Sequence, residues 1–177
     1  MIYSVTLLFG LILAPLLVQL RGYKPAALFF TVAAVYAVFG AASFARIQIA
    51  LSQVREAEPA YQETYYVMSH AYFLLNIGIA MAVFGAITLA QTRFGVMRYP
   101  GLTKLLFWIL HITLIGSTSF QGVLAFILPK PRRYIDYPEF METYLLIISW
   151  SGVLSQAALL GLLCLLLWSI TARWLAS

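Results

Sequence analysis

Charged residues are scarce in this chain. They make up 10% of its 177 residues, against 63% hydrophobic residues, and the mean hydropathy is +0.91. A soluble domain carries about 25% charged residues, so the soluble globular class is excluded. The apolar residues recur in runs of about 20, the length that crosses the hydrocarbon core of a bilayer as a helix. The composition therefore predicts an all-α polytopic membrane protein.

Cysteine is also nearly absent. The one cysteine, Cys164, lies inside an apolar run, so the chain forms no internal disulfide and says nothing about its redox compartment. The net charge of +5 does not indicate nucleic-acid binding, because the basic residues stand singly or in pairs between apolar runs. This distribution is typical of membrane topology signals.

Five apolar segments are predicted to be transmembrane helices within a single transmembrane domain. The domain covers residues 1–177, and the spans are approximately 2–20, 25–48, 64–92, 102–128 and 140–172. The first segment has no basic start and no small-residue cleavage site, so we read it as a span and not as a signal peptide. Five spans put the termini on opposite sides, and the distribution of Lys and Arg favours the N-terminus outside and the C-terminus inside.

Acidic residues are absent from the apolar core of every span. All six lie in or beside two connections on the predicted outer side, around residues 56–63 and 136–142. A proton-coupled carrier or pump usually needs a carboxylate within the membrane. The sequence therefore disfavours a self-sufficient transporter.

Only two histidines occur in the chain. His70 is expected about a turn and a half inside the third span, where an ionisable side chain is unfavourable unless it has a partner or a function. His111 lies in the fourth span, which runs antiparallel to the third. Counting from their shared connection puts the two imidazoles roughly 20 Å apart in depth. They are therefore not expected to bind one metal ion together.

A pair of arginines follows the fourth span on the predicted outer side, the side of His70. The forked donors of Arg132 and Arg133 match carboxylates. An imidazole below such a pair is what a buried haem requires, with the histidine on iron and the arginines on the propionates. Two other interpretations stay open: a histidine hydrogen-bonded within the helix bundle, and a basic pair that anchors the interface or contacts lipid headgroups. We read His111 as a bundle residue.

Two stretches carry a resemblance to a known family. The stretch Thr64-Tyr65-Tyr66-Val67-Met68-Ser69-His70 resembles the start of the tenth helix of haem-copper oxidase subunit I. The stretch Pro131-Arg132-Arg133-Tyr134-Ile135-Asp136-Tyr137-Pro138 resembles that family's loop between helices eleven and twelve. With looser similarity elsewhere, the resemblance extends over the C-terminal five helices, eight to twelve, of a twelve-helix subunit.

The resemblance implies a reduced cofactor site. It makes His70 the axial ligand of a haem iron, and Arg132 and Arg133 the ligands of the haem propionates. Where the family has a second histidine for its electron-transfer haem, this chain has Tyr72. The family's copper ligands lie on helices six and seven, which this chain does not contain. The resemblance thus implies haem as the cofactor, no copper, and no catalysis by this chain alone.

Three functions are compatible with this pattern. We favour a membrane subunit of a respiratory oxidase-type complex, a degenerate relative of the catalytic subunit with reduced or relic haem binding. One alternative is the split catalytic half of a terminal oxidase, completed by a partner chain that supplies helices one to seven and the copper ligands. The other is a haem-free assembly or structural factor. The expected partners are other membrane subunits and the lipid bilayer, in a bacterial or archaeal plasma membrane or the mitochondrial inner membrane.

Overall fold

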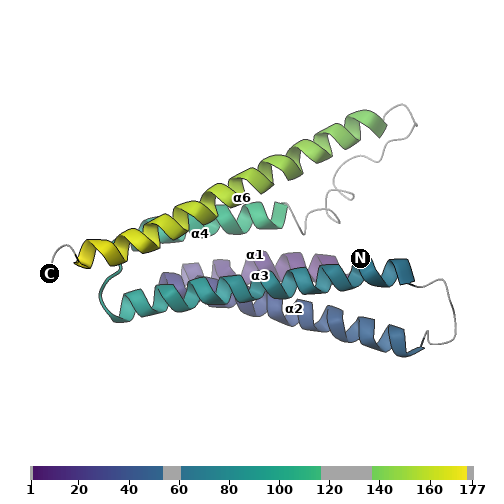
Figure 1. Cartoon of the computed structure of the whole chain (residues 1–177), viewed down its shortest axis with the longest axis horizontal. Coiled ribbons are helices and arrows are strands. Elements are labelled where there is room, and N and C mark those ends of the chain that lie inside the picture. The colour runs from purple at the N-terminus through teal and green to yellow at the C-terminus, as the bar shows by residue number, and fades with distance from the viewer. Residues whose placement is uncertain (1, 54–60, 117–136, 175–177) are drawn as a thin grey trace. The chain divides into compact units, whose positions relative to one another are not determined.

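A computed structural model of the chain describes residues 2–53, 61–116 and 137–174 (Figure 1). Within these ranges the regular structure is entirely helical. The five helices are α1 (Ile2–Leu20), α2 (Pro25–Gln53), α3 (Tyr61–Arg93), α4 (Pro100–Leu114) and α6 (Tyr137–Trp174). The prediction of an all-α chain with five helices is confirmed. The second half of the predicted fourth span, from residue 117 on, lies outside the described residues.

Three of the helices are long and apolar enough to cross a membrane. Their apolar portions are Pro25–Ile49, Ala71–Arg93 and Leu145–Ala172, and two shorter apolar helices are Val5–Leu20 and Pro100–Leu114. Glu142 belongs to α6 but precedes its apolar portion. The polytopic membrane class is therefore confirmed, whereas the orientation of the termini and the single-domain organisation stay predictions.

Two helices end in the same glycine-dependent cap. After α1, Gly22 adopts φ +70°, and after α3, Gly95 adopts φ +66°. In each case the glycine N–H bonds a carbonyl three residues back, and the next N–H bonds one five residues back. This is the Schellman pattern, which places a glycine in the left-handed conformation just beyond the helix. Pro25 and Pro100 then start the next helices, at positions where no N–H is needed.

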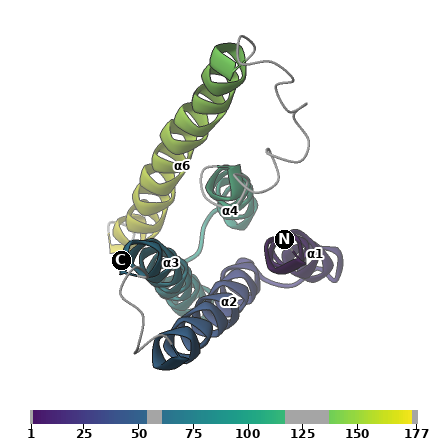
Figure 2. The ribbon, with the colours of Figure 1, turned by 90° about the vertical axis from the view of Figure 1, so that its right-hand side faces the viewer.

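The described structure divides into two compact units. The N-terminal unit contains residues 10–87, and the C-terminal unit contains residues 88–177 together with 1–9. Within the N-terminal unit, α2 and α3 lie side by side and antiparallel (Figures 1 and 2). The ring of Phe29 stacks on that of Phe84, with centroids 5.9 Å apart. At the other end of the contact, the rings of Phe44 and Tyr72 meet edge to face at 5.8 Å.

Glycines bring α2 and α3 close together between these aromatic pairs. A Cβ on Gly78 would lie 3.3 Å from the carbonyl oxygen of Ala33 and 3.3 Å from the amide nitrogen of Ala37. A Cβ on Gly40 would lie 2.8 Å from Cγ of Leu75. Small residues at helix contacts in membranes let backbones approach and maximise van der Waals packing. These positions therefore hold α2 and α3 in one register.

In the C-terminal unit, α4 and α6 pack against each other. A Cβ on Gly161 of α6 would lie 3.4 Å from Cδ2 of Leu106 on α4. The end of α3 is tied to α6 by a buried hydrogen bond, in which Gln91 Nε2 donates to the carbonyl of Leu166 at 2.9 Å. A side-chain amide that bonds a helix carbonyl across an interface fixes the two elements at one point along their lengths.

Candidate functional site

The predicted haem-binding residues lie at the edge of what the structure describes. The backbone of residue 70 is part of α3, but the side chain of His70 lies outside the described portion. Arg132 and Arg133 fall in the range 117–136, which is likewise outside it. Their roles stay predictions.

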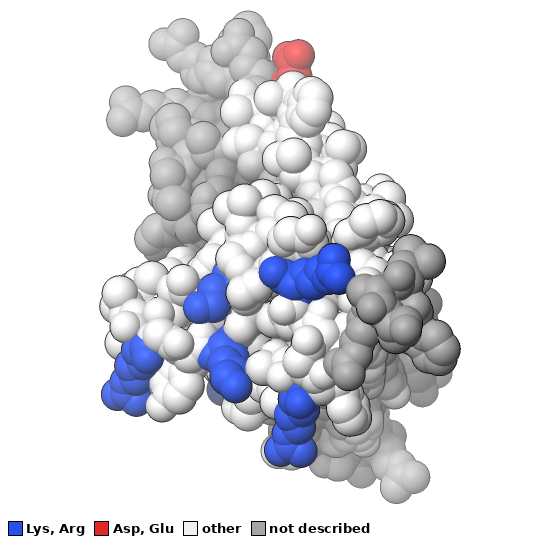
Figure 3. Space-filling view, turned by 90° about the vertical axis from the view of Figure 1, so that its left-hand side faces the viewer, with Lys and Arg blue, Asp and Glu red and all other residues white. Residues whose placement is uncertain are grey.

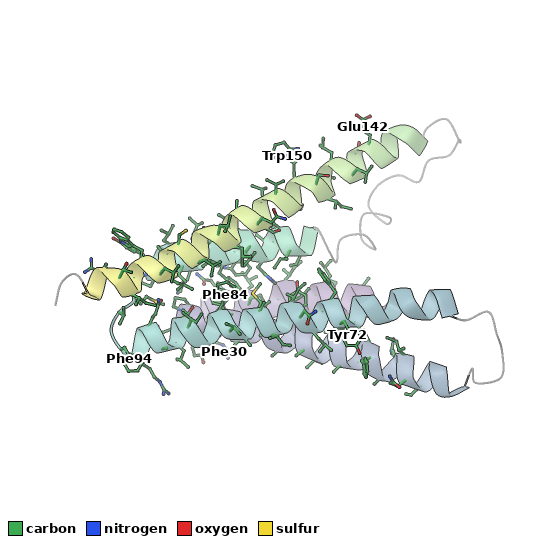
Figure 4. All side chains as sticks on the ribbon, in the orientation of Figure 1. Phe30, Tyr72, Phe84, Phe94, Glu142 and Trp150 are labelled. Atoms are coloured by element: carbon green, nitrogen blue, oxygen red, sulfur yellow. The ribbon has the colours of Figure 1, made fainter. Side chains whose placement is uncertain are left out.

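Tyr72 lies two residues beyond position 70 along α3, and Ala71 between them is buried. The side chain of Tyr72, labelled in Figure 4, is 49% exposed. Its ring lies against that of Phe44 of α2, with an interplanar angle of 67°. The resemblance predicted from the sequence places this phenol where the family has its second haem-ligating histidine. A phenol can ligate iron only as a phenolate, as in catalase. The residue that departs from the family pattern therefore has a side chain that is about half exposed.

The α2/α3 register gives the height of one cation, Arg46, that the sequence pattern had identified only as a topology signal. Phe44 meets Tyr72 across antiparallel helices. Arg46 lies two residues beyond Phe44, and residue 70 lies two residues before Tyr72. Both steps run in the same direction, by about 3 Å at 1.5 Å per residue. Arg46, whose side chain is exposed, is therefore level with position 70. The relative height of Arg46 and position 70 follows from the pairing of α2 with α3 and is not evident from the sequence.

His111 has a different environment. It is fully buried in the C-terminal unit. Its ring stacks on that of Phe107 at 5.5 Å and meets Trp108 edge to face at 6.0 Å. Phe107 and Thr103, one and two turns earlier in α4, are buried on the same face. The surroundings of His111 are those of a packed bundle residue, the role that the sequence analysis gave it.

The described part of the chain contains no group of three or more His, Cys, Asp or Glu side chains that could hold a metal ion. The single cysteine, Cys164, is exposed and is not in a disulfide.

The helices and their composition define an integral membrane protein of the all-α class. Within that class the chain resembles part of cytochrome c oxidase subunit 1, so the predicted resemblance to haem-copper oxidase subunit I is confirmed. It is 31% identical over 124 residues to that subunit from Cereibacter sphaeroides, 28% over 107 residues to that from Albinaria turrita, and 30% over 109 residues to that from Plasmodium berghei.

The resemblance is partial in both directions. The three matches cover 70%, 60% and 57% of this chain, but 22%, 54% and 21% of the respective relatives. The chain thus spans about a fifth of two of these relatives and about half of the third. No family model and no solved structure matches the chain.

Proposed function

We propose that this chain is a membrane subunit of a respiratory oxidase-type complex, equivalent to the C-terminal helices eight to twelve of subunit I. In this role it binds one haem at most and contains no complete oxygen-reducing centre. The single observation that carries the proposal is the 31% identity over 124 residues to a cytochrome c oxidase subunit 1. The membrane would be a bacterial or archaeal plasma membrane or the mitochondrial inner membrane.

The donor set fits one haem. The imidazole of His70 would be the axial ligand, and the guanidiniums of Arg132 and Arg133 would bind the propionates. When bound, the haem would supply redox chemistry at its iron. The tyrosine at position 72 supports a single haem, because a second haem would lack its usual histidine.

Exposed amide side chains support the need for partner helices. Asn76, in the apolar portion of α3, and Gln156, in that of α6, are both exposed. Facing lipid, an amide would leave its donors and acceptor without partners, which is unfavourable in hydrocarbon. Hydroxyl side chains in the same helices avoid this problem locally. Thr92, for example, donates to the carbonyl of Thr88 at 2.8 Å, and Ser169 donates to that of Leu165 at 2.9 Å.

The occupant that fits these amides is a set of transmembrane helices outside this sequence. The relatives are longer than the matched region, and polar side chains are a usual means of contact between membrane helices. The short coverage also favours a second candidate, the split catalytic half of a terminal oxidase. In that case a partner chain would carry helices one to seven and the copper ligands.

Purification of the native complex tests the proposal. We expect mass spectrometry to find the chain with other respiratory subunits, and pyridine haemochrome analysis to find haem. A full-length subunit I in the same complex would identify a degenerate relative, whereas a seven-helix partner with copper-ligating histidines would identify the split enzyme. Absence of the chain from any mature complex would contradict both and indicate an assembly factor.

The double variant Asn76→Leu/Gln156→Leu should co-purify with partner subunits roughly fivefold less than the wild type, because two interhelical amide contacts are lost. Recovery is measured by quantitative mass spectrometry. The matched control is Val83→Leu/Val153→Leu, which changes exposed apolar positions on the same two helices and should leave recovery unchanged. Equal recovery of both variants would show that the two amides make no partner contact.

Measuring how much haem each variant retains should distinguish a propionate-binding role of Arg132 and Arg133 from a general basic contact with the membrane. Arg132→Ala and Arg133→Ala are each expected to lower the haem content after detergent washing by about tenfold, since each removes a charge-assisted contact to a propionate. Lys130→Ala, one residue before the predicted Pro131-Arg132-Arg133 stretch, should have little effect. If the three variants lost haem equally, the pair would be an interfacial anchor.

A further inference from the structure

The connection between α3 and α4 is a basic surface without acidic neighbours in sequence. Arg93 ends α3, Arg98 lies in the connection, and Lys104 lies in the first turns of α4. The sequence has no Asp or Glu between residues 64 and 135. The described acid of the same unit, Glu142, lies about 45 Å along α6 from Ala172, at 1.5 Å per residue. Figure 3 shows Lys and Arg side chains at the surface.

This connection has a defined conformation. Gly95 reverses the chain at φ +66°, and the N–H groups of Val96 and Met97 both donate to the carbonyl of Gln91, at 2.9 and 3.3 Å. One guanidinium nitrogen of Arg98 donates to the carbonyl of Ala172, near the end of α6, at 3.1 Å. That bond holds the Arg98 side chain in place and leaves its other N–H groups for a second acceptor.

Apolar side chains adjoin the cations. Phe94 is 72% exposed, and Tyr99 and Leu102 are 45% and 44% exposed. Leu102 and Lys104 occupy the start of α4, an apolar helix that begins at Pro100. Exposed aromatic residues beside basic residues at the end of a membrane helix are typical of the headgroup region. A soluble anion would match only the charges, whereas a phospholipid would match the cations with its phosphate and the apolar side chains with its acyl chains.

We propose that the α3–α4 connection binds the headgroup of an anionic phospholipid. Arg93 and Lys104 supply charge from the two helix ends, and Arg98 supplies a guanidinium that is already oriented by α6. Guanidinium and ammonium groups both bind phosphate, and each basic residue near an anionic membrane surface strengthens binding. The inference does not depend on haem binding or on the proposed function.

The test uses the full chain purified in detergent and stripped of endogenous lipid, with phosphatidylglycerol added and bound lipid counted by native mass spectrometry. Arg93→Gln/Lys104→Gln should weaken phosphatidylglycerol binding by on the order of tenfold and leave phosphatidylcholine binding unchanged. This pair keeps the Arg98–Ala172 hydrogen bond and hence the connection. The matched control, Arg21→Gln/Lys24→Gln, also removes one Arg and one Lys beside a Schellman cap and should change binding less than twofold.

Two further arms make the result decisive. Arg98→Lys keeps the charge but not the fork, and should lose several-fold in affinity if the oriented guanidinium contacts the phosphate. Inorganic phosphate in excess should not displace the lipid. Equal losses from the two double variants would overturn the proposal in favour of diffuse attraction. Displacement by inorganic phosphate would overturn it in favour of a soluble-anion site.

Discussion

Replacing His70 with alanine is expected to remove most of the haem from the purified complex. The proposed imidazole ligand would bond the protein directly to the iron, whereas the arginines would contact only the propionates at the edge of the porphyrin. Changes to groups that merely orient a metal ligand lower metal affinity by about 10–100-fold, so loss of the ligand itself should exceed tenfold. Haem content is measured by pyridine haemochrome, and the visible spectrum of any residual haem should change.

The control for this variant is the other histidine. His111→Gln retains a polar side chain of similar size in the buried position between Phe107 and Trp108. It should leave haem content and spectrum intact, even if it lowers stability. Haem loss in the His111 variant together with an unchanged spectrum in the His70 variant would reverse the assignment. Imidazole added to the His70→Ala protein should restore part of the spectrum, which separates a missing ligand from a misfolded chain.

Most of the helical architecture could be predicted from the sequence, because a membrane helix is dictated by the length of an apolar run. Span 2–20 coincides with α1, and the predicted end of the third span at residue 92 lies one residue from the end of α3 at Arg93. The starts are less exact. Helix α3 begins at Tyr61, three residues before the predicted start, because its first residues are polar and hydropathy does not detect a helix that extends beyond the hydrocarbon.

The register between helices could not be predicted from the sequence. Both α2 and α3 are apolar along most of their length, so periodicity does not show which face packs or at what height. The glycines at 40 and 78 determine this, but their role is visible only when the opposing backbone is seen. For the same reason Arg46 remained a topology signal, since its level relative to position 70 depends on that register.

The candidate site was predicted from rarity and resemblance. Position 70 stood out because an ionisable residue in an apolar span is uncommon, and Tyr72 stood out because it departs from the family pattern. For Arg132 and Arg133 the sequence remains the sole support, since both lie outside the described residues. What the structure adds is the surroundings: Phe44 against Tyr72, and the packed rings around His111.

Gly78→Leu is expected to be strongly destabilising, by about 3 kcal/mol, in keeping with the upper range for overpacked cores. The atoms that its Cβ would meet, the carbonyl oxygen of Ala33 and the amide nitrogen of Ala37, belong to the backbone of α2. A side chain could rotate away, but these atoms can move only if the whole helix moves. Separation of α2 and α3 would then also weaken the ring contacts at both ends of the pair. The measurement is denaturation of the purified chain in mild detergent, followed by circular dichroism.

Variants at two further glycines should differ from Gly78→Leu in stability, in an order that the structure predicts. Gly40→Ala brings a single methyl group against the side chain and amide nitrogen of Leu75, and because the leucine can partly yield, its cost should be smaller than that of Gly78→Leu. Gly152→Leu, in the apolar portion of α6, meets nothing within 4 Å and should be neutral or slightly stabilising, since leucine has the higher helix propensity. Equal stability of the Gly78 and Gly152 variants would mean that α2 and α3 do not pack backbone to backbone. The close approach of Gly78 to the backbone of α2 would then be absent, and with it one of the contacts that fix the register of the two helices.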